Sequence, residues 1–208
     1  MFYWICKILF SPILWILYPT RFIHKRNIPK KGKMILVMNH QSNRDALVLG
    51  SHIRRKLHFM AKKELFEKKF AGWVYKKWGA FPVNRTSTDL NAIKTSLKLL
   101  KQGKAMAIFP EGTRREGTDM SAAKNGAAMF ASKTESPIIP AIFVKKPKPF
   151  RFNKVIVGEP FYLHEIFGTT NLTKEQLAEA GKLISEKIME LPQKYEESKK
   201  KIKNKTQQ

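Results

Sequence analysis

The stretch from residue 34 to residue 45 reads Met34-Ile35-Leu36-Val37-Met38-Asn39-His40-Gln41-Ser42-Asn43-Arg44-Asp45. Five consecutive apolar residues followed by Asn and His predict a buried strand that runs into a polar loop. In open α/β sheets, loops at the carboxyl ends of strands hold ligands. We therefore expect the chemistry of the chain to begin in this loop.

His40 is followed, after four intervening residues, by the carboxylate of Asp45. This spacing puts His40 at the tip of the strand and Asp45 in the first turn of the next helix, where the helix dipole favours a negative charge. Asp45 can then fold back onto one ring nitrogen of His40, which fixes the tautomer and leaves the other nitrogen free to accept a proton. The pair is a candidate general base with its orienting carboxylate.

Apolar runs typical of buried strands alternate along the chain with segments of helical periodicity. Strands are expected over residues 34–38, 57–61, 105–109, 138–144 (broken at Pro140) and 155–158, and helices over 45–53, 63–78, 88–102, 122–132 and from 173 to about 191. This alternation predicts an α/β fold. We divide the chain into an N-terminal segment (1–28), an α/β domain (29–192) and a Lys-rich tail (193–208), which is expected to be frayed or disordered.

The charge balance is strongly basic. Forty Lys and Arg residues against 16 Asp and Glu give a net charge of +24 over 208 residues, a length that suits one domain. Such a protein should bind a polyanion, either a nucleic acid or an anionic membrane face, or an acidic substrate. Because Cys6 is the single cysteine, an internal disulfide framework and a cysteine-rich zinc site are excluded, and a reducing, cytosol-facing location fits.

The N-terminal segment from residue 2 to residue 18 is strongly apolar and rich in aromatic residues. As a helix it would be roughly 25 Å long, less than the roughly 30 Å of a hydrocarbon core, and Lys7 and Pro12 interrupt it. We expect it to dip into one leaflet at the cytoplasmic face of the cell membrane; a buried core helix followed by a charged linker is the alternative. The basic residues that follow it favour the membrane: Arg21, Lys25, Arg26, Lys30, Lys31 and Lys33.

A second polar loop follows the expected strand at 105–109 and runs from Pro110 to Arg114. It should meet the first loop at one edge of the sheet. Arg114 and Arg85 carry planar, permanently charged groups suited to a phosphate, and Gly112 allows the backbone to approach a bound group. Together the two loops suggest a base that deprotonates a hydroxyl on a phosphorylated molecule.

Four motifs in this order resemble those of the glycerolipid acyltransferases. Residues 39–45, Asn-His-Gln-Ser-Asn-Arg-Asp, match their HxxxxD motif, and residues 109–114, Phe-Pro-Glu-Gly-Thr-Arg, match a second strong motif. Residues 81–85 resemble the intervening block that ends in Arg, and residues 137–140 resemble the final block with proline. The resemblance covers about residues 30 to 160. Within the family, the small size, the N-terminal apolar segment and the unmodified second motif resemble the bacterial 1-acyl-sn-glycerol-3-phosphate acyltransferases.

The resemblance implies a mixed sheet flanked by helices, with an N-terminal membrane-associated helical segment. It also implies acyl transfer from acyl-CoA or acyl carrier protein to the 2-hydroxyl of lysophosphatidic acid, giving phosphatidic acid, at an anionic membrane surface. No cofactor, no metal and no nucleic acid are expected. Carried over residue by residue, His40 is the general base and Asp45 its orienter, Arg85 is a phosphate ligand, and the acceptor site includes Glu111, Gly112, Thr113 and Arg114.

Three alternatives stay open at this point. The acceptor could be another lysophospholipid or glycerol 3-phosphate. The chain could be a non-catalytic basic protein that binds anionic lipid or nucleic acid, although it carries no common nucleic-acid motif. Ser42 could act as a nucleophile, but a serine two residues from His40 is poorly placed to meet its ring. The oxyanion donors are expected among the backbone N–H groups after His40 or a nearby cation.

Overall fold

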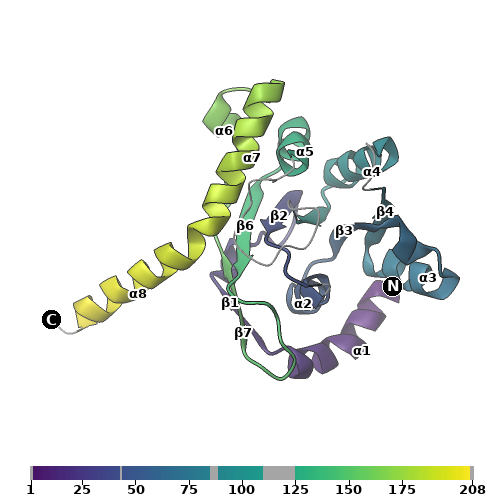
Figure 1. Cartoon of the computed structure of the whole chain (residues 1–208), viewed down its shortest axis with the longest axis horizontal. Helices are drawn as coiled ribbons and strands as arrows, with labels where there is room; N and C mark the ends of the chain where they lie inside the picture. The colour runs from purple at the N-terminus through teal and green to yellow at the C-terminus, as the bar shows by residue number, and fades with distance from the viewer. Residues whose placement is uncertain (1, 43, 85–88, 110–124, 207–208) are drawn as a thin grey trace.

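The computed structural model describes residues 2–42, 44–84, 89–109 and 125–206, which build one seven-stranded sheet covered by helices (Figure 1). The strand order is β1-β7-β6-β2-β5-β3-β4, and all neighbours are parallel except β6 and β7. The strands are β1 (Thr20–Ile23), β2 (Met34–Met38), β3 (Leu57–Lys62), β4 (Ala80–Val83), β5 (Ala105–Ile108), β6 (Ile138–Phe143) and β7 (Asn153–Val157).

The helices form a layer on each face of the sheet. They are α1 (Phe2–Leu17), α2 (Arg44–His52), α3 (Lys69–Trp78), α4 (Leu90–Lys101), α5 (Gly126–Thr134), α6 (Leu163–Phe167), α7 (Lys174–Met189) and α8 (Leu191–Thr206), with 3₁₀ turns η1 (Lys25–Asn27) and η2 (Lys63–Phe66). Helices α4, α5 and α7 pack on one face, whereas α2 packs on the other and is itself covered by α1 (Figure 1). The expected α/β architecture is confirmed.

Strand β2 lies at the centre of the sheet, between β6 and β5. All five of its side chains are buried, because alternate residues point to opposite faces and both faces are covered. Ile35 and Val37 join the core beneath α4, α5 and α7, and Met34, Leu36 and Met38 join the core beneath α2. The apolar run at 34–38 was therefore a correct prediction of a strand buried on both faces.

The structure departs from the predicted elements in the middle of the chain. Strand β6 continues through Pro140, because the Pro140 carbonyl and both polar groups of Ile138 face the β7 side, where Gly158 and Phe161 bond to them. The missing N–H of Pro140 therefore lies on the β7 side and costs no bond to the central strand β2, and the Gly158 carbonyl accepts from the Asn27 side chain at 3.0 Å instead. The expected single helix at 63–78 divides into η2 and α3, which fold together so closely that a Cβ on Gly72 would lie 2.6 Å from the Phe66 carbonyl oxygen.

Both ends of the chain differ from the prediction as well. Residues 20–23 form the edge strand β1, which pairs in parallel with β7 and has no predicted counterpart. The tail expected to be frayed or disordered continues as the helix α8, which extends away from the sheet (Figure 1). Pro192 is tolerated in its first turn, and the ring of Tyr195 packs against the core beneath the ammonium of Lys154.

The strands that precede the two polar loops end at the same edge of the sheet. Because β2 and β5 are parallel neighbours in register, with Val37 opposite Ile108, Asn39 and Phe109 leave the sheet at the same edge. The end of β6 reaches this edge too, since Met38 pairs with Ala141. The strands that precede the two predicted loops therefore end side by side, and the second loop itself, residues 110–114, lies outside the described residues.

Candidate active site

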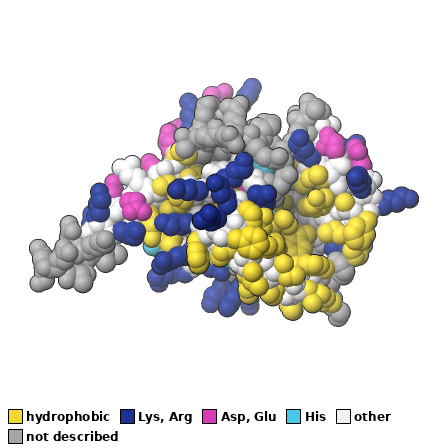
Figure 2. Space-filling view, turned by 60° about the horizontal axis from the view of Figure 1, so that its bottom comes forward, with side chains coloured by type: hydrophobic (Ala, Val, Ile, Leu, Met, Phe, Trp, Pro, Cys, Tyr) yellow, Lys and Arg dark blue, Asp and Glu magenta, His cyan; other side chains and the backbone are white. Residues whose placement is uncertain are grey.

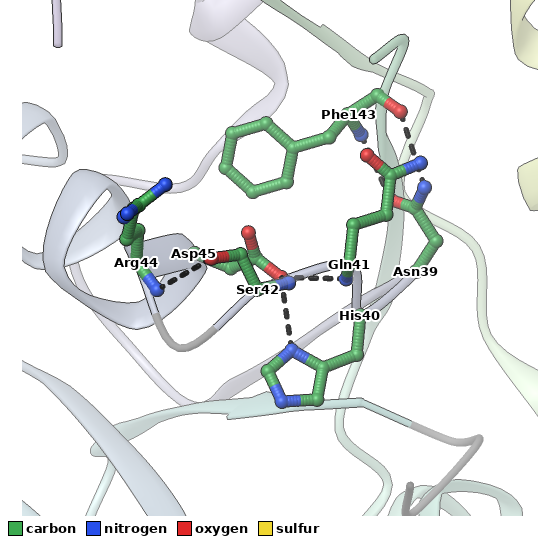
Figure 3. Close-up of polar contacts among 7 residues, drawn as sticks. All are labelled: Asn39, His40, Gln41, Ser42, Arg44, Asp45 and Phe143. Carbon is green, nitrogen blue, oxygen red and sulfur yellow. Dashed lines mark hydrogen bonds and ion pairs between the residues drawn. The ribbon is translucent and has the colours of Figure 1, made fainter. Parts of the chain in front are cut away.

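His40 and Asp45 form a buried pair at the carboxyl end of β2 (Figure 3). Nδ1 of His40 lies 2.9 Å from Oδ2 of Asp45, and the Asp45 side chain is 0% exposed. The carboxylate is therefore the acceptor for an Nδ1–H, which leaves Nε2 as the unprotonated nitrogen of a neutral ring. Figure 3 shows that this second nitrogen points away from Asp45.

Asp45 also organises the loop between the pair. Its Oδ2 atom accepts hydrogen bonds from the backbone N–H groups of Gln41 and Ser42, both at 2.8 Å. The side chain lies in the first turn of α2, where unpaired N–H groups and the helix dipole favour an anion. The same oxygen thus fixes the course of the chain after His40, and it accepts from the imidazole as the spacing of the motif predicted.

Phe109, the first residue after β5, supports His40 from the neighbouring strand. Its ring stacks on the imidazole with centroids 4.2 Å apart and an angle of 22° between the planes. The stack shields one face of the imidazole from water and restricts rotation of the ring. The sequence assigned Phe109 to a motif and gave it no role; its position directly after an apolar strand was the available signal.

Asn39 was also missed as a functional candidate. Its side-chain amide accepts from the Phe143 N–H at 2.8 Å and donates to the Phe143 carbonyl at 3.1 Å, which joins the ends of β2 and β6 (Figure 3). A polar residue directly after the apolar strand and next to His40 was a signal in the sequence. Its partner, 104 residues away, was not visible there.

Most of the backbone N–H groups after His40 already donate hydrogen bonds within the protein. Those of Gln41 and Ser42 donate to Asp45, that of Arg44 donates to the Ser42 hydroxyl, and that of Asp45 donates to the Ser42 carbonyl. This argues against these four groups as the oxyanion donors that the sequence suggested. It also gives the Ser42 hydroxyl a structural partner at the start of α2.

The Acyltransferase family model matches residues 20–144. The chain belongs to the acyltransferase family. The 1-acyl-sn-glycerol-3-phosphate acyltransferase of Bacillus subtilis is 34% identical over 188 residues, which cover 86% of this chain and 90% of that protein. The corresponding protein of Streptococcus pneumoniae is 31% identical, and the match covers 69% of this chain and 54% of that protein.

A solved structure shares the fold of this acyltransferase. The 1-acyl-sn-glycerophosphate (LPA) acyltransferase PlsC from Thermotoga maritima superposes with a TM-score of 0.68 at 24% identity, covering 89% of this chain and 78% of that one. The recognition made from the four motifs is confirmed, and the chain is an enzyme that transfers acyl groups. The alternative that the chain is a non-catalytic basic protein is therefore excluded.

Several predicted site residues of the acyltransferase lie outside the described residues: Arg85, Glu111, Gly112, Thr113 and Arg114. Their roles stay predictions. Among the residues that are described, no group of three or more His, Cys, Asp or Glu side chains is arranged to hold a metal ion.

Two further histidines are explained by packing. His58 lies at the start of β3, at the opposite edge of the sheet, and its Nδ1 is 3.1 Å from the Ala105 carbonyl. His52 stacks on Phe22 on the α1 side of the molecule. Burial lowers the pKa of both imidazoles, partly offset by a backbone hydrogen bond in each case.

Proposed function

We propose that this acyltransferase moves a fatty acyl group from acyl-CoA or acyl carrier protein to the 2-hydroxyl of 1-acyl-sn-glycerol 3-phosphate, giving phosphatidic acid, at the cytoplasmic face of the cell membrane. The observation that carries the proposal is the buried contact between His40 and Asp45 at the edge where both motif loops begin. The names of the relatives from Bacillus subtilis and Streptococcus pneumoniae support the choice of acceptor.

The pair is suited to general-base catalysis. Nε2 of His40 takes the proton of the 2-hydroxyl as its oxygen attacks the thioester carbonyl, and the carbonyl electrons move onto oxygen. The tetrahedral intermediate then collapses, the C–S bond breaks, and the imidazolium returns its proton to the leaving thiolate. Asp45 stabilises the imidazolium through Nδ1, and a base of this kind contributes typically 10²–10⁴-fold to the rate.

Helix α1 supports a membrane location because it buries its polar side chains and exposes its apolar ones, the reverse of a surface helix in water. Its polar residues Lys7 and Ser11 are buried against the protein, whereas Ile8 and Ile16 are each 72% exposed. A surface helix of a water-soluble domain would bury the apolar face and expose the polar one. This arrangement supports the proposal that the 16 residues of α1 lie in an interface, with an apolar medium outside. Among the described residues, no helix is long and apolar enough to cross a membrane.

The apolar surface continues beyond α1. Phe70, Trp73 and Val74 on α3 are also exposed, and α3 contacts α1. Figure 2 shows a broad hydrophobic area on this side of the molecule with Lys and Arg side chains beside it. An apolar area of this extent next to cations suits an anionic bilayer, which offers both environments.

The acceptor can be tested directly with the purified chain. Release of the donor thiol would be measured with acyl-CoA and with acyl carrier protein, in the absence of acceptor and with each of lysophosphatidic acid, lysophosphatidylethanolamine, lysophosphatidylglycerol and glycerol 3-phosphate. We expect thiol release that depends on lysophosphatidic acid. Equal or faster transfer to another acceptor would replace the proposed substrate while leaving the chemistry in place.

The catalytic assignment rests on His40. In His40→Ala, kcat should fall by about 10²–10⁴-fold, because the transition state loses its proton acceptor. His164→Ala on α6 is the matched control, since this histidine lies on a helix that packs against α5, and its activity should equal that of the wild type. Full acyl transfer by His40→Ala would refute the role of the base.

A further inference from the structure

The connection between β6 and β7, residues 144–152, exposes two phenylalanines among basic residues. It reads Val-Lys-Lys-Pro-Lys-Pro-Phe-Arg-Phe, and no acidic residue occurs between residues 136 and 158. Phe150 is 72% exposed and Phe152 is 93% exposed. The charged residues Lys145, Lys146, Lys148 and Arg151 are exposed beside them. We refer to residues 144–152 as the aromatic-basic loop.

The loop is held in place by the residue that follows it. The side-chain oxygen of Asn153, a buried residue, accepts the Lys148 N–H at 3.0 Å, and its nitrogen donates to the Arg151 carbonyl at 2.8 Å. Phe150 has a left-handed backbone with φ of +55°, which an L residue adopts only at a cost. The loop therefore has a conformation fixed by hydrogen bonds, with both phenylalanine side chains exposed to the surroundings.

The loop is also joined to the end of α1. The Phe150 N–H donates to the Leu17 carbonyl at 2.7 Å, and the Asn153 N–H donates to the Pro19 carbonyl at 2.8 Å. Figure 1 shows that the loop lies below the sheet, next to the carboxyl end of α1. The apolar face of α1 and the two phenylalanines are thus neighbours, although about 130 residues separate them in the sequence.

We propose that the aromatic-basic loop is a second membrane contact, which inserts Phe150 and Phe152 at the interface and places its Lys and Arg side chains against anionic lipid head groups. This inference rests on the membrane association proposed above for α1. Aromatic side chains sit at the level of the head groups, and basic residues near a membrane are attracted to anionic lipid. The exposed phenylalanines and their continuity with α1 favour a bilayer over an acidic protein partner.

A second contact would fix the orientation of the enzyme. A single interfacial helix leaves the protein free to tilt about the axis of that helix. The aromatic-basic loop follows Phe143, which Asn39 joins to the strand end that carries His40. Contact of both α1 and the loop with the bilayer therefore holds the edge of the sheet with His40 on the membrane side, where a lipid acceptor resides.

Vesicle binding of the full-length chain tests the proposal. Partition onto vesicles of phosphatidylcholine with 30% phosphatidylglycerol would be measured by sedimentation for the wild type, Phe152→Ala and the double variant Phe150→Ala with Phe152→Ala. Loss of one inserted phenylalanine should weaken partition by roughly tenfold, and loss of both by more. Ile166→Ala on α6, which also removes an exposed apolar side chain, is the matched control and should bind as the wild type does.

Variants of α1 separate this proposal from the one it rests on. If Ile8→Ser with Ile16→Ser abolishes partition while the loop variants bind within twofold of the wild type, the loop proposal is wrong and the membrane role of α1 stands. If neither set of variants weakens partition, both proposals fail. If the loop variants bind vesicles normally but raise KM for acyl carrier protein, the loop is a protein contact and the membrane proposal for it is overturned.

A fluorescent probe gives a second readout that does not depend on affinity. In a Cys6→Ser background, an environment-sensitive dye on Phe152→Cys should shift to the blue when vesicles are added, whereas the same dye on Leu90→Cys of α4 should not. Position 152 is almost fully exposed, so the labelled variant should fold. An unshifted dye at position 152 on vesicle-bound protein would overturn the insertion of this side chain.

Discussion

The variant Asp45→Asn removes the negative charge of Asp45 but keeps the shape of its side chain. In the wild type, Oδ2 accepts from two backbone N–H groups and from His40, and Oδ1 is buried without a hydrogen-bond partner among the described residues. In the variant, the N–H groups of Gln41 and Ser42 select the orientation of the amide, because only its oxygen can accept from them. The amide oxygen therefore takes the place of Oδ2, and His40 keeps its tautomer.

The expected loss of catalytic rate in Asp45→Asn is accordingly the loss of charge alone, whereas the amide NH₂, which takes the buried Oδ1 position, costs stability. A hydrogen bond to a charged partner stabilises by about 1.5–3 kcal/mol, against about 0.5–1.5 kcal/mol for a neutral one. Because the amide oxygen keeps a neutral hydrogen bond to Nδ1, the imidazolium of the transition state loses only the difference of about 1–1.5 kcal/mol. The value of kcat should then fall by about 5–13-fold, since each 1.36 kcal/mol is tenfold in rate. KM for the acceptor should change little, because Asp45 acts through His40.

The assay is steady-state thiol release with lysophosphatidic acid, with the circular dichroism spectrum as a check on folding. Asp45→Ala is the matched comparison. It leaves two loop N–H groups without an acceptor, so it should lose about 2–4 kcal/mol of stability as well as activity. A loss below threefold in Asp45→Asn would refute the electrostatic role of Asp45. A loss near 10⁴-fold would refute the claim that the loop fixes the amide, because it would indicate the wrong tautomer of His40.

Three further predictions follow from neighbouring contacts. Phe109→Leu should lower kcat by about 2–10-fold without a comparable change in KM, because it removes a ring stack worth about 0.5–1.5 kcal/mol beside His40; an unchanged kcat would contradict the supporting role of the ring. Ser42→Ala should retain activity within a few-fold, and complete loss together with an acyl-enzyme trapped by the wild type would establish Ser42 as a nucleophile. Burial lowers the pKa of Lys7 from 10.5 to about 8, so its protonated form costs stability below pH 8 and this cost disappears as the pH rises towards 10.5. The free energy of unfolding of the wild type, measured in urea relative to Lys7→Met, should therefore increase by about 1–2 kcal/mol between pH 7.5 and 9.5. This figure is reduced for partial solvent screening of the charge. A difference between the two proteins that stays constant with pH would contradict the burial of this charge.

The contact between His40 and Asp45 could be predicted from the sequence because its geometry is local. A buried strand fixes where His40 emerges, and a helix that begins four residues later returns Asp45 to the same point. Gly103 likewise marks the end of α4, with the left-handed φ of +71° that a helix stop favours. These features depend on residues within a few positions of one another.

Long-range contacts could not be predicted in the same way. The bond between Asn39 and Phe143, the stack of Phe109 on His40 and the pairing of β1 with β7 each depend on the order of strands in the sheet. Nor does the sequence of α1 reveal which face is covered, since apolar residues occur all around it. Only the packing against α2 shows that Lys7 lies inside.

Helix α2 links the two halves of the proposed mechanism. Its first turn carries Asp45, and the carbonyls at and beyond its last turn are held by side chains of α1. Lys7 donates to the Ile53 carbonyl and Trp15 to that of Ser51. Because α2 has nine residues, its rigid length of about 13 Å joins the turn that carries Asp45 to the turn that α1 holds. If α1 lies in a bilayer as proposed, α2 therefore fixes the position of the His40–Asp45 pair relative to the lipid that binds α1.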